Sequence, residues 1–301
     1  MEIAQLALIL GLTTGIGEKT TERVLRLLYA RQWEGEYLLS LPAEQLISDY
    51  GLTRKSAHQL TEQRDTLIAK SAALLKKLRQ AGVFIATHQS SIYPTRWEQY
   101  ASDPPQVAYL YGRLNLLERA TLAVAVSRDA SSAALKRAEE AADVALKLNF
   151  QLVTGHNIPT YQRVALTAKR QAKPTITVLD RGLWDAFDED FSRQLFPAAR
   201  IWEPAFDPRQ DLVMTPFHPH CHGIGQNNRR RDHCIFSLAD VVIAIGVRPG
   251  GTMEKECRHV AKTGRPVLAF DDLTFVSKNQ STFYPIYDLT EQLTSIQPKY
   301  T

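Results

Sequence analysis

A glycine-rich turn is the clearest candidate for a binding site in this sequence. Gly250, Gly251 and Thr252 follow the apolar run 241–245 and precede an amphipathic stretch that begins at Met253. Glycines allow positive φ angles and close backbone approach, and the first turn of a helix presents free N–H groups to an anion. The pattern therefore favours a phosphate cradle, with Thr252 as cap or hydroxyl donor. The alternative is a tight strand-to-helix turn without a ligand.

The densest basic cluster of the chain lies just upstream of that run. Arg229, Arg230 and Arg231 are consecutive and precede the apolar stretch 234–245. Because guanidinium groups pair bidentately with phosphate oxygens, the cluster favours contact with a nucleic-acid backbone. A solvated charged face, or arginines paired within a dimer, is the other interpretation.

A third polar loop follows the apolar run 122–126. In it, Ser127 and Arg128 are placed to reach a phosphate, and Ser131 and Ser132 can cap the following helix. Capping alone explains the serines equally well.

Catalytic motifs are sparse. The sequence has no G-x-S-x-G elbow and no H-E-x-x-H pair. Glu254 and Glu256, just after the glycine turn, have the chemistry of a general acid or base. Carboxylates at that position are also favourable simply because they face the positive end of a helix dipole.

One tract is rich in residues that can bind metals, namely His218, His220, Cys221 and His222. Its spacing does not match the ligand pattern of a zinc site, and two nearby prolines indicate an irregular loop. Packing within a loop is therefore favoured over a metal, and we expect no cofactor.

The elements that position these residues change character near residue 82. Up to that point apolar residues recur at helical spacing, which predicts a small helical domain over 1–82. Within it, Gly15-Ile16-Gly17 resembles the turn of a helix-hairpin-helix, in which backbone amides can contact a DNA phosphate. Acidic neighbours leave plain helix packing as the alternative.

From residue 83 onwards, short apolar runs alternate with helical stretches. This alternation predicts an α/β domain over 83–270 with a doubly wound, mostly parallel Rossmann-like sheet, followed by an extension over 271–301. Such sheets bind ligands at the carboxyl ends of their strands. The strands are expected at 83–86, 108–111, 122–126, 151–154, 175–179, 241–245 and 267–270.

Composition sets broad limits. The chain has 301 residues, 36 basic and 32 acidic side chains, and a formal charge of +4, which permits nucleic-acid binding without requiring it. Three cysteines without framework spacing favour a reducing cytoplasm. The apolar stretch 3–12 is too short to span a membrane.

Several further motifs occur in a fixed order along residues 92–270. They are Tyr93-Pro94, Asp103-Pro104-Pro105, the strand Tyr109 to Gly112, the loop Val124 to Ser131, the turn Val153-Thr154-Gly155, the strand Thr175 to Leu179, the triplet Arg231-Asp232-His233, the glycine turn and the entry Gly264 to Val267. In this order and spacing the chain resembles the DprA/Smf family of DNA-processing proteins. The glycine turn also looks like that of the related nucleotide phosphoribohydrolases.

The resemblance implies binding of single-stranded DNA, homodimerisation and loading of a RecA-type recombinase during DNA uptake, without catalytic chemistry. The resemblance also places Thr154, Gly155 and the backbone amides of the glycine turn against the bound DNA strand. Arg128, Arg229 to Arg231 and Lys255 are expected to line a positive channel beside them.

The departures from the family pattern are informative. His156 replaces a family glycine, and Asp232 and His233 replace the Asn and second Arg of Arg-Asn-Arg. The family's Asp and His are also missing from the stretch over 159–165, and the C-terminus leaves no room for a winged helix. Asp232 is expected to weaken phosphate contact by adding negative charge, which Arg229 and Arg230 can offset.

This divergence suggests a specialised paralogue in an anti-phage or toxin–antitoxin module, acting as a DNA sensor or as antitoxin to a cognate toxin. Two other classes stay open. One is a nucleotide N-glycosidase-like hydrolase that uses Glu254 or Glu256, and the other is a protein-interaction module with a vestigial pocket.

Overall fold

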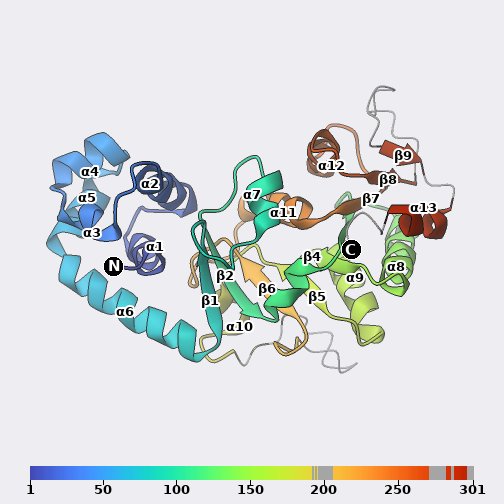
Figure 1. Cartoon of the computed structure of the whole chain (residues 1–301), viewed down its shortest axis with the longest axis horizontal. Helices are drawn as coiled ribbons and strands as arrows, with labels where there is room; N and C mark the ends of the chain where they lie inside the picture. The colour runs from blue at the N-terminus through green and yellow to red at the C-terminus, as the bar shows by residue number, and fades with distance from the viewer. Residues whose placement is uncertain (192, 194, 196–205, 271–282, 286–287, 297–301) are drawn as a thin grey trace. The chain divides into compact units, whose positions relative to one another are not determined.

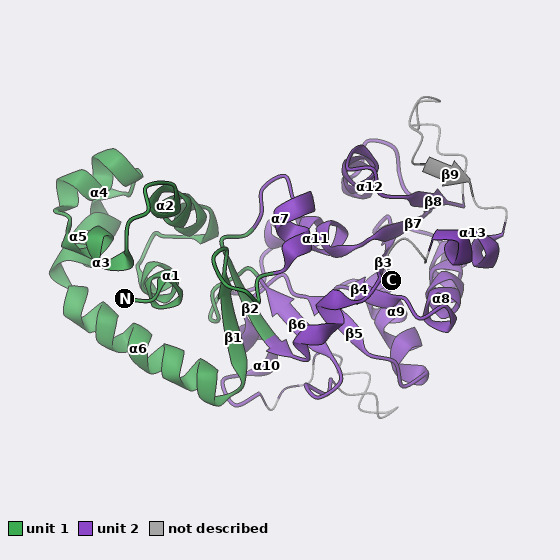
Figure 2. Ribbon diagram, in the orientation of Figure 1, with its two compact units in different colours: residues 1–93, 105–110, 216–221 green, residues 94–104, 111–215, 222–301 purple. Residues whose placement is uncertain are grey.

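The computed structural model describes residues 1–191, 193, 195, 206–270, 283–285 and 288–296. The chain forms two compact units, which are coloured separately in Figure 2. The first comprises residues 1–93, 105–110 and 216–221, and the second comprises 94–104, 111–215 and 222–301. Part of the predicted extension over 271–301 lies outside the described residues.

The first unit begins with helices and continues into strands, as the labels in Figure 1 show. In α1 the buried side chains include Leu6, Leu8 and Leu10, so this helix is enclosed on several sides. The elements are α1 (Ile3–Leu12), α2 (Glu18–Ala30), α3 (Gly35–Ser40), α4 (Ala43–Tyr50), α5 (Arg54–Glu62), α6 (Arg64–Gln80), β1 (Val83–Thr87) and the first residues of β2 (Val107–Gly112).

The second unit alternates strands and helices, as the sequence predicts. Its elements are α7 (Thr95–Tyr100), η1 (Leu114–Glu118), β3 (Thr121–Val126), α8 (Ser132–Lys147), β4 (Gln151–Thr154), α9 (Pro159–Arg170), β5 (Thr175–Val178), α10 (Leu183–Phe187), β6 (Leu212–Thr215), α11 (Asn227–Leu238), β7 (Val241–Ile245), α12 (Thr252–Lys262), β8 (Val267–Ala269), β9 (Phe283–Pro285) and α13 (Leu289–Ile296).

The sheet of this unit is doubly wound. Its strands lie in the order β6-β5-β4-β3-β7-β8-β9, and every neighbouring pair is parallel. From β3 the chain moves outward to β6 and then returns to the other side of β3 with β7. The carboxyl ends of β3 and β7 therefore mark the switch point, where such sheets leave room for a ligand. The predicted fold class is confirmed.

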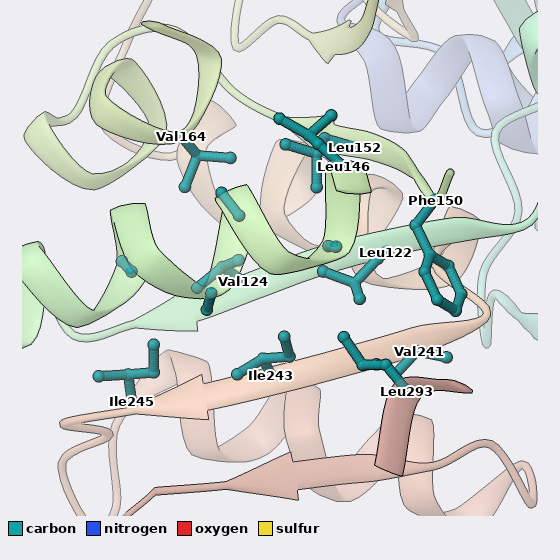
Figure 3. Packing of buried hydrophobic residues seen from close by; sticks show 14 of the residues in the cluster. Leu122, Val124, Leu146, Phe150, Leu152, Val164, Val241, Ile243, Ile245 and Leu293 are labelled. Atoms are coloured by element: carbon teal, nitrogen blue, oxygen red, sulfur yellow. The ribbon is translucent and has the colours of Figure 1, made fainter. Parts of the chain in front are cut away.

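The main core of the second unit lies on one face of β3 and β7 (Figure 3). Leu122, Val124 and Ile243 pack there with side chains of α8, α9 and α13. Ala123 and Ala125 point to the other face and are buried as well. Because both faces are covered, these strands read in the sequence as continuous apolar runs rather than alternating ones.

Two features differ from the sequence expectation or were absent from it, and one agrees with it. β6 and β9 were not among the strands expected from the sequence, and pairing with β5 and β8 makes them extended. The arginine cluster, which was expected ahead of a helix-to-strand stretch, lies inside α11. Within the described ranges, each helix is too short or too polar to cross a lipid bilayer.

Candidate nucleic-acid interface

A cavity of about 340 Å³ opens at the carboxyl ends of β3 and β7. Four arginines and two aspartates line it, so its described lining carries a formal charge of +2. The lining residues are Val126, Ser127, Arg128, Asp129, Ile158, Gly225, Asn228, Arg229, Arg231, Asp232, Arg248, Gly251, Thr252 and Met253. We call this the switch-point cavity.

The glycine turn forms one wall of the cavity. Gly250 has a φ of 74°, a conformation that favours glycine, and Gly251 is the N-cap of α12. Gly251 and Thr252 line the cavity, so the first turn of α12 faces it. The Gly250 amide, by contrast, donates to the carboxylate of Glu254 and is already used. The amides that can meet an anion are therefore those at the start of the helix.

Arg231 forms the floor of the cavity and is only 1% exposed. Its Nε donates to Asp232 Oδ1 at 2.8 Å, and its Nη1 donates to Asn157 Oδ1. The guanidinium also stacks over the ring of Tyr161, with 4.8 Å from its Cζ to the ring centroid. A Cβ on Gly155 would lie 2.6 Å from that ring, so glycine there permits the stacking.

Two arginines at the rim are exposed. Arg128 comes from the loop after β3 and Arg229 from the first turn of α11. Neither has an ion-pair partner among the residues that the structure describes. These two guanidinium groups can therefore bind an anionic ligand without breaking an existing pair.

Arg248 joins the two loops that flank the cavity. Its backbone amide donates to Ser127 Oγ at 2.7 Å, and its Nη1 lies 2.9 Å from Asp129 Oδ2. Both side chains of this pair are mostly exposed, at 69% and 71%. Exposed pairs contribute little to stability, so Arg248 can exchange Asp129 for a phosphate at small cost.

Asp232, which the sequence predicts to weaken phosphate contact, lines the cavity and is paired with Arg231. It is 5% exposed and accepts hydrogen bonds from Arg231 and from Tyr161 Oη, the latter at 2.7 Å. Burial raises the pKa of Asp232, and the hydrogen bonds from its two partners oppose that rise. The carboxylate thus holds Arg231 in place beneath the cavity.

Comparisons with known proteins identify the family of this chain. A family model described as DNA recombination-mediator protein A matches residues 84–298. The chain belongs to this family. Searching curated proteins by sequence gives no match.

Two solved structures share the fold of this recombination-mediator family member. The Streptococcus pneumoniae DNA processing protein A is 19% identical, with a TM-score of 0.62, and the match covers 98% of this chain and 93% of that one. The Helicobacter pylori protein, described for its single-stranded DNA binding mode, is 15% identical with a TM-score of 0.53. That match covers 73% of this chain and 97% of the other.

Six of the twelve predicted binding residues of this family member meet at the cavity, namely Ser127, Arg128, Arg229, Arg231, Gly251 and Thr252. Arg230 lies on another side of α11, where its Nη1 donates to the carbonyl of Asp103 at 2.6 Å. The other predicted residues, Ser131, Thr154, Gly155, Gly250 and Lys255, do not line the cavity.

Those other residues have structural contacts in their own right. Ser131 caps α8 by accepting from the Ala134 amide at 3.2 Å, and Thr154 Oγ1 donates to the carbonyl of Tyr161 at 3.2 Å. Lys255 is exposed on α12. Sequence reasoning missed Arg248 and Asn228 as lining residues, although Arg248 lies two residues before the glycine turn and Asn228 directly before the arginine cluster.

The two glutamates considered for catalysis are occupied by other groups. Glu254 accepts from Arg258 Nε at 2.6 Å and from the Gly250 amide. Burial acts to raise its pKa, but those hydrogen bonds outweigh burial and lower it. Glu256 Oε2 lies 3.1 Å from His233 Nδ1. Neither carboxylate lines the switch-point cavity.

The histidine tract does not assemble into one group. His222 pairs with Asp185 in the second unit, whereas His218, His220 and Cys221 line a cavity of about 350 Å³ in the first unit. Within the described part of the chain, no cluster of three or more His, Cys, Asp or Glu side chains could hold a metal ion.

The turn at residues 15–17, which resembles that of a helix-hairpin-helix in sequence, borders that same cavity of the first unit. Ile16 and Gly17 line it together with Glu18 and Glu22, and no lysine or arginine is among the described lining residues. This acidic lining supports the packing interpretation of the turn over a phosphate contact.

The buried imidazole of His156 predicts a pH dependence of stability. It is 9% exposed, and burial lowers its pKa to about 4 although Asp180, 3.8 Å away, acts to raise it. As the pH falls from about 6.5 to about 4, the unfolded chain takes up a proton that the folded chain excludes.

The expected result is a loss of about 3 kcal/mol in unfolding free energy across that interval, attributable to His156. Urea denaturation at several pH values measures it, and His156→Gln isolates it because buried His218 contributes a similar dependence to both proteins. Parallel pH profiles for the wild type and the variant would contradict the prediction.

Proposed function

We propose that this chain binds single-stranded DNA by its phosphates at the switch-point cavity and performs no chemistry there. The observation that carries the proposal is the pair of exposed arginines, Arg128 and Arg229, facing the start of α12 across the switch point. Guanidinium groups and helix N-terminal amides are both ligands for phosphate oxygens.

The other features of the cavity support a role in binding. Arg231 supplies a buried positive charge beneath the rim, held by Asn157 and Asp232. The cavity volume of about 340 Å³ lies at the small end of the range for ligand pockets. It suits part of a strand backbone, with the strand continuing across the surface. The family membership and the single-stranded DNA binding described for the Helicobacter pylori relative point the same way.

The alternatives have less support. The hydrolase predicted to use Glu254 or Glu256 is less supported because those side chains are held outside the cavity by Arg258 and His233. The two carboxylates that do line the cavity, Asp129 and Asp232, are paired with Arg248 and Arg231. The homodimer, the RecA-type recombinase, the cognate toxin and the setting in anti-phage defence stay predictions from the family resemblance.

Fluorescence anisotropy with a labelled oligothymidylate tests the proposal. We expect the double change Arg128→Ala with Arg229→Ala to weaken binding about a hundredfold, because two charge-assisted phosphate contacts are removed. The slope of log K against log salt should become shallower by about 0.7 for each lost contact.

A matched control is Arg209→Ala. Arg209 belongs to the same unit, its side chain is 88% exposed, and it pairs with Asp207 away from the cavity. It should bind like the wild type. Equal affinity of the double variant and the wild type, or weakening by the control alone, would place the DNA elsewhere.

A further inference from the structure

The first unit contains a larger cavity beside the end of α2. Its volume is about 880 Å³, and it combines aromatic rings with side-chain amides. The lining residues are Met1, Glu2, Ile3, Leu25, Tyr29, Ala30, Gln32, Trp33, Glu34, Thr87, His88, Gln89 and Gln106. We call this the aromatic cavity.

Three of these residues carry rings. Tyr29 is 49% exposed, and its ring centroid lies 5.5 Å from that of His88. Trp33 is half-buried, with the Arg31 guanidinium 4.7 Å from its ring centroid. An exposed tyrosine ring beside a cavity is a platform on which a planar ligand can stack.

The turn that presents these rings contains an unusual backbone conformation. Trp33 N donates to the carbonyl of Leu28 and Gln32 N to that of Tyr29, each at 3.0 Å, which closes α2 with a Schellman motif. The left-handed position of this motif usually holds glycine, but here it is Gln32, with a φ of 55°. The chain thus keeps a less favourable residue that places an amide at the cavity.

The polar lining is suited to an uncharged ligand. Gln32, Gln89 and Gln106 offer amide donors and acceptors, and no lysine or arginine is among the described residues that line the cavity. The carboxylates of Glu2 and Glu34 also line the cavity and disfavour a phosphate. The edge of a nucleobase matches amide groups, and its face matches the rings.

We propose that the aromatic cavity binds an unpaired nucleobase of single-stranded DNA, stacked on Tyr29 and hydrogen-bonded by Gln32. The proposal rests on the DNA binding proposed for the switch-point cavity and adds a second, base-recognising site in the other unit. The affinity that this site contributes depends on the bases of the DNA rather than on its phosphates.

The test compares a labelled oligothymidylate with an abasic oligonucleotide of the same length, which keeps the phosphates and lacks the bases. Stacking of one base predicts that the full-length wild type binds the oligothymidylate about tenfold more tightly. Tyr29→Ala should abolish that preference while leaving affinity for the abasic strand unchanged.

The variant Gln32→Gly removes the side-chain amide without destabilising the fold. Glycine is favoured at the left-handed position, so this variant should unfold at a temperature no lower than the wild type. It should nonetheless bind the oligothymidylate about fivefold more weakly, because one hydrogen bond to the base is lost. Phe84→Ala is the control for an exposed ring, since Phe84 is 44% exposed in the same unit and does not line the cavity.

The outcomes distinguish the two proposals. The change of Arg128 and Arg229 to alanine should weaken the binding of both oligonucleotides by the same factor. It should leave the preference for the oligothymidylate over the abasic strand intact. Equal binding of both strands by the wild type, or an unchanged preference in Tyr29→Ala, would overturn the base site alone. Binding of neither strand by the wild type would overturn the proposed function.

Discussion

Replacing Arg231 with alanine is expected to lower the free energy of unfolding by about 3–5 kcal/mol, because it leaves a buried partner charge without compensation. Arg231 is 1% exposed and holds Asp232, which is 5% exposed. Without the guanidinium, Asp232 keeps, among the described residues, only the hydrogen bond from Tyr161. The variant also loses the floor of the switch-point cavity, so DNA affinity should fall as well.

Urea denaturation measures this effect, with Arg229→Ala as the control from the same helix. Arg229 is exposed, and its loss should change stability by no more than about 0.5 kcal/mol. Burial already raises the pKa of Asp232, and removing Arg231 raises it further. The deficit of Arg231→Ala should therefore shrink as the pH falls, because Asp232 takes up a proton in the folded variant. A deficit below about 1 kcal/mol at neutral pH would show that the pair is not a buried, compensated one.

The second large effect is expected at Asp211, which is 0% exposed. Its Oδ1 accepts from the Thr175 amide at 2.9 Å, its Oδ2 accepts from the Asp207 amide at 3.0 Å, and Lys169 Nζ pairs with Oδ2. Asp211→Ala removes the acceptor for two amides and leaves the Lys169 ammonium, 9% exposed, without its carboxylate. A loss of about 3–5 kcal/mol follows.

The position of Asp211 predicts that its replacement lowers stability without changing DNA affinity. It lies just before β6 and contacts the first residue of β5, so it ties together the amino ends of these strands. The switch-point cavity lies at the carboxyl ends of β3 and β7. The folded fraction of Asp211→Ala should therefore bind DNA with wild-type affinity.

A double-mutant cycle provides the control for this pair. Adding Lys169→Met should recover part of the stability lost in Asp211→Ala, since the uncompensated ammonium is then removed. Additive losses in the two single variants would contradict a coupled buried pair.

Local patterns in the sequence were enough to predict the fold class. The runs 122–126 and 241–245 are apolar throughout because both faces of these strands are covered, and both lie in strands of the structure. The run 151–154, with an apolar centre between Gln151 and Thr154, also forms a strand. The glycine turn at 250–252 was expected at a helix start because glycine tolerates a positive φ, and Gly250 has one.

Tertiary structure decided which polar groups face a ligand. The three consecutive arginines look equivalent in the sequence, but in α11 each residue turns about 100° from the last. Arg229 therefore reaches the rim, Arg230 meets Asp103 and Arg231 is buried.

The charge of Asp232 and the roles of the glutamates depended in the same way on partners far along the chain, Tyr161 for Asp232 and His233 for Glu256. The aromatic cavity has no sequence signal either, because Tyr29, His88 and Gln106 meet only once the first unit folds. Periodicity and turn chemistry act between near neighbours, and so they determine elements. Burial, side-chain direction and pairing act across the chain, and so only the folded structure determines the sites.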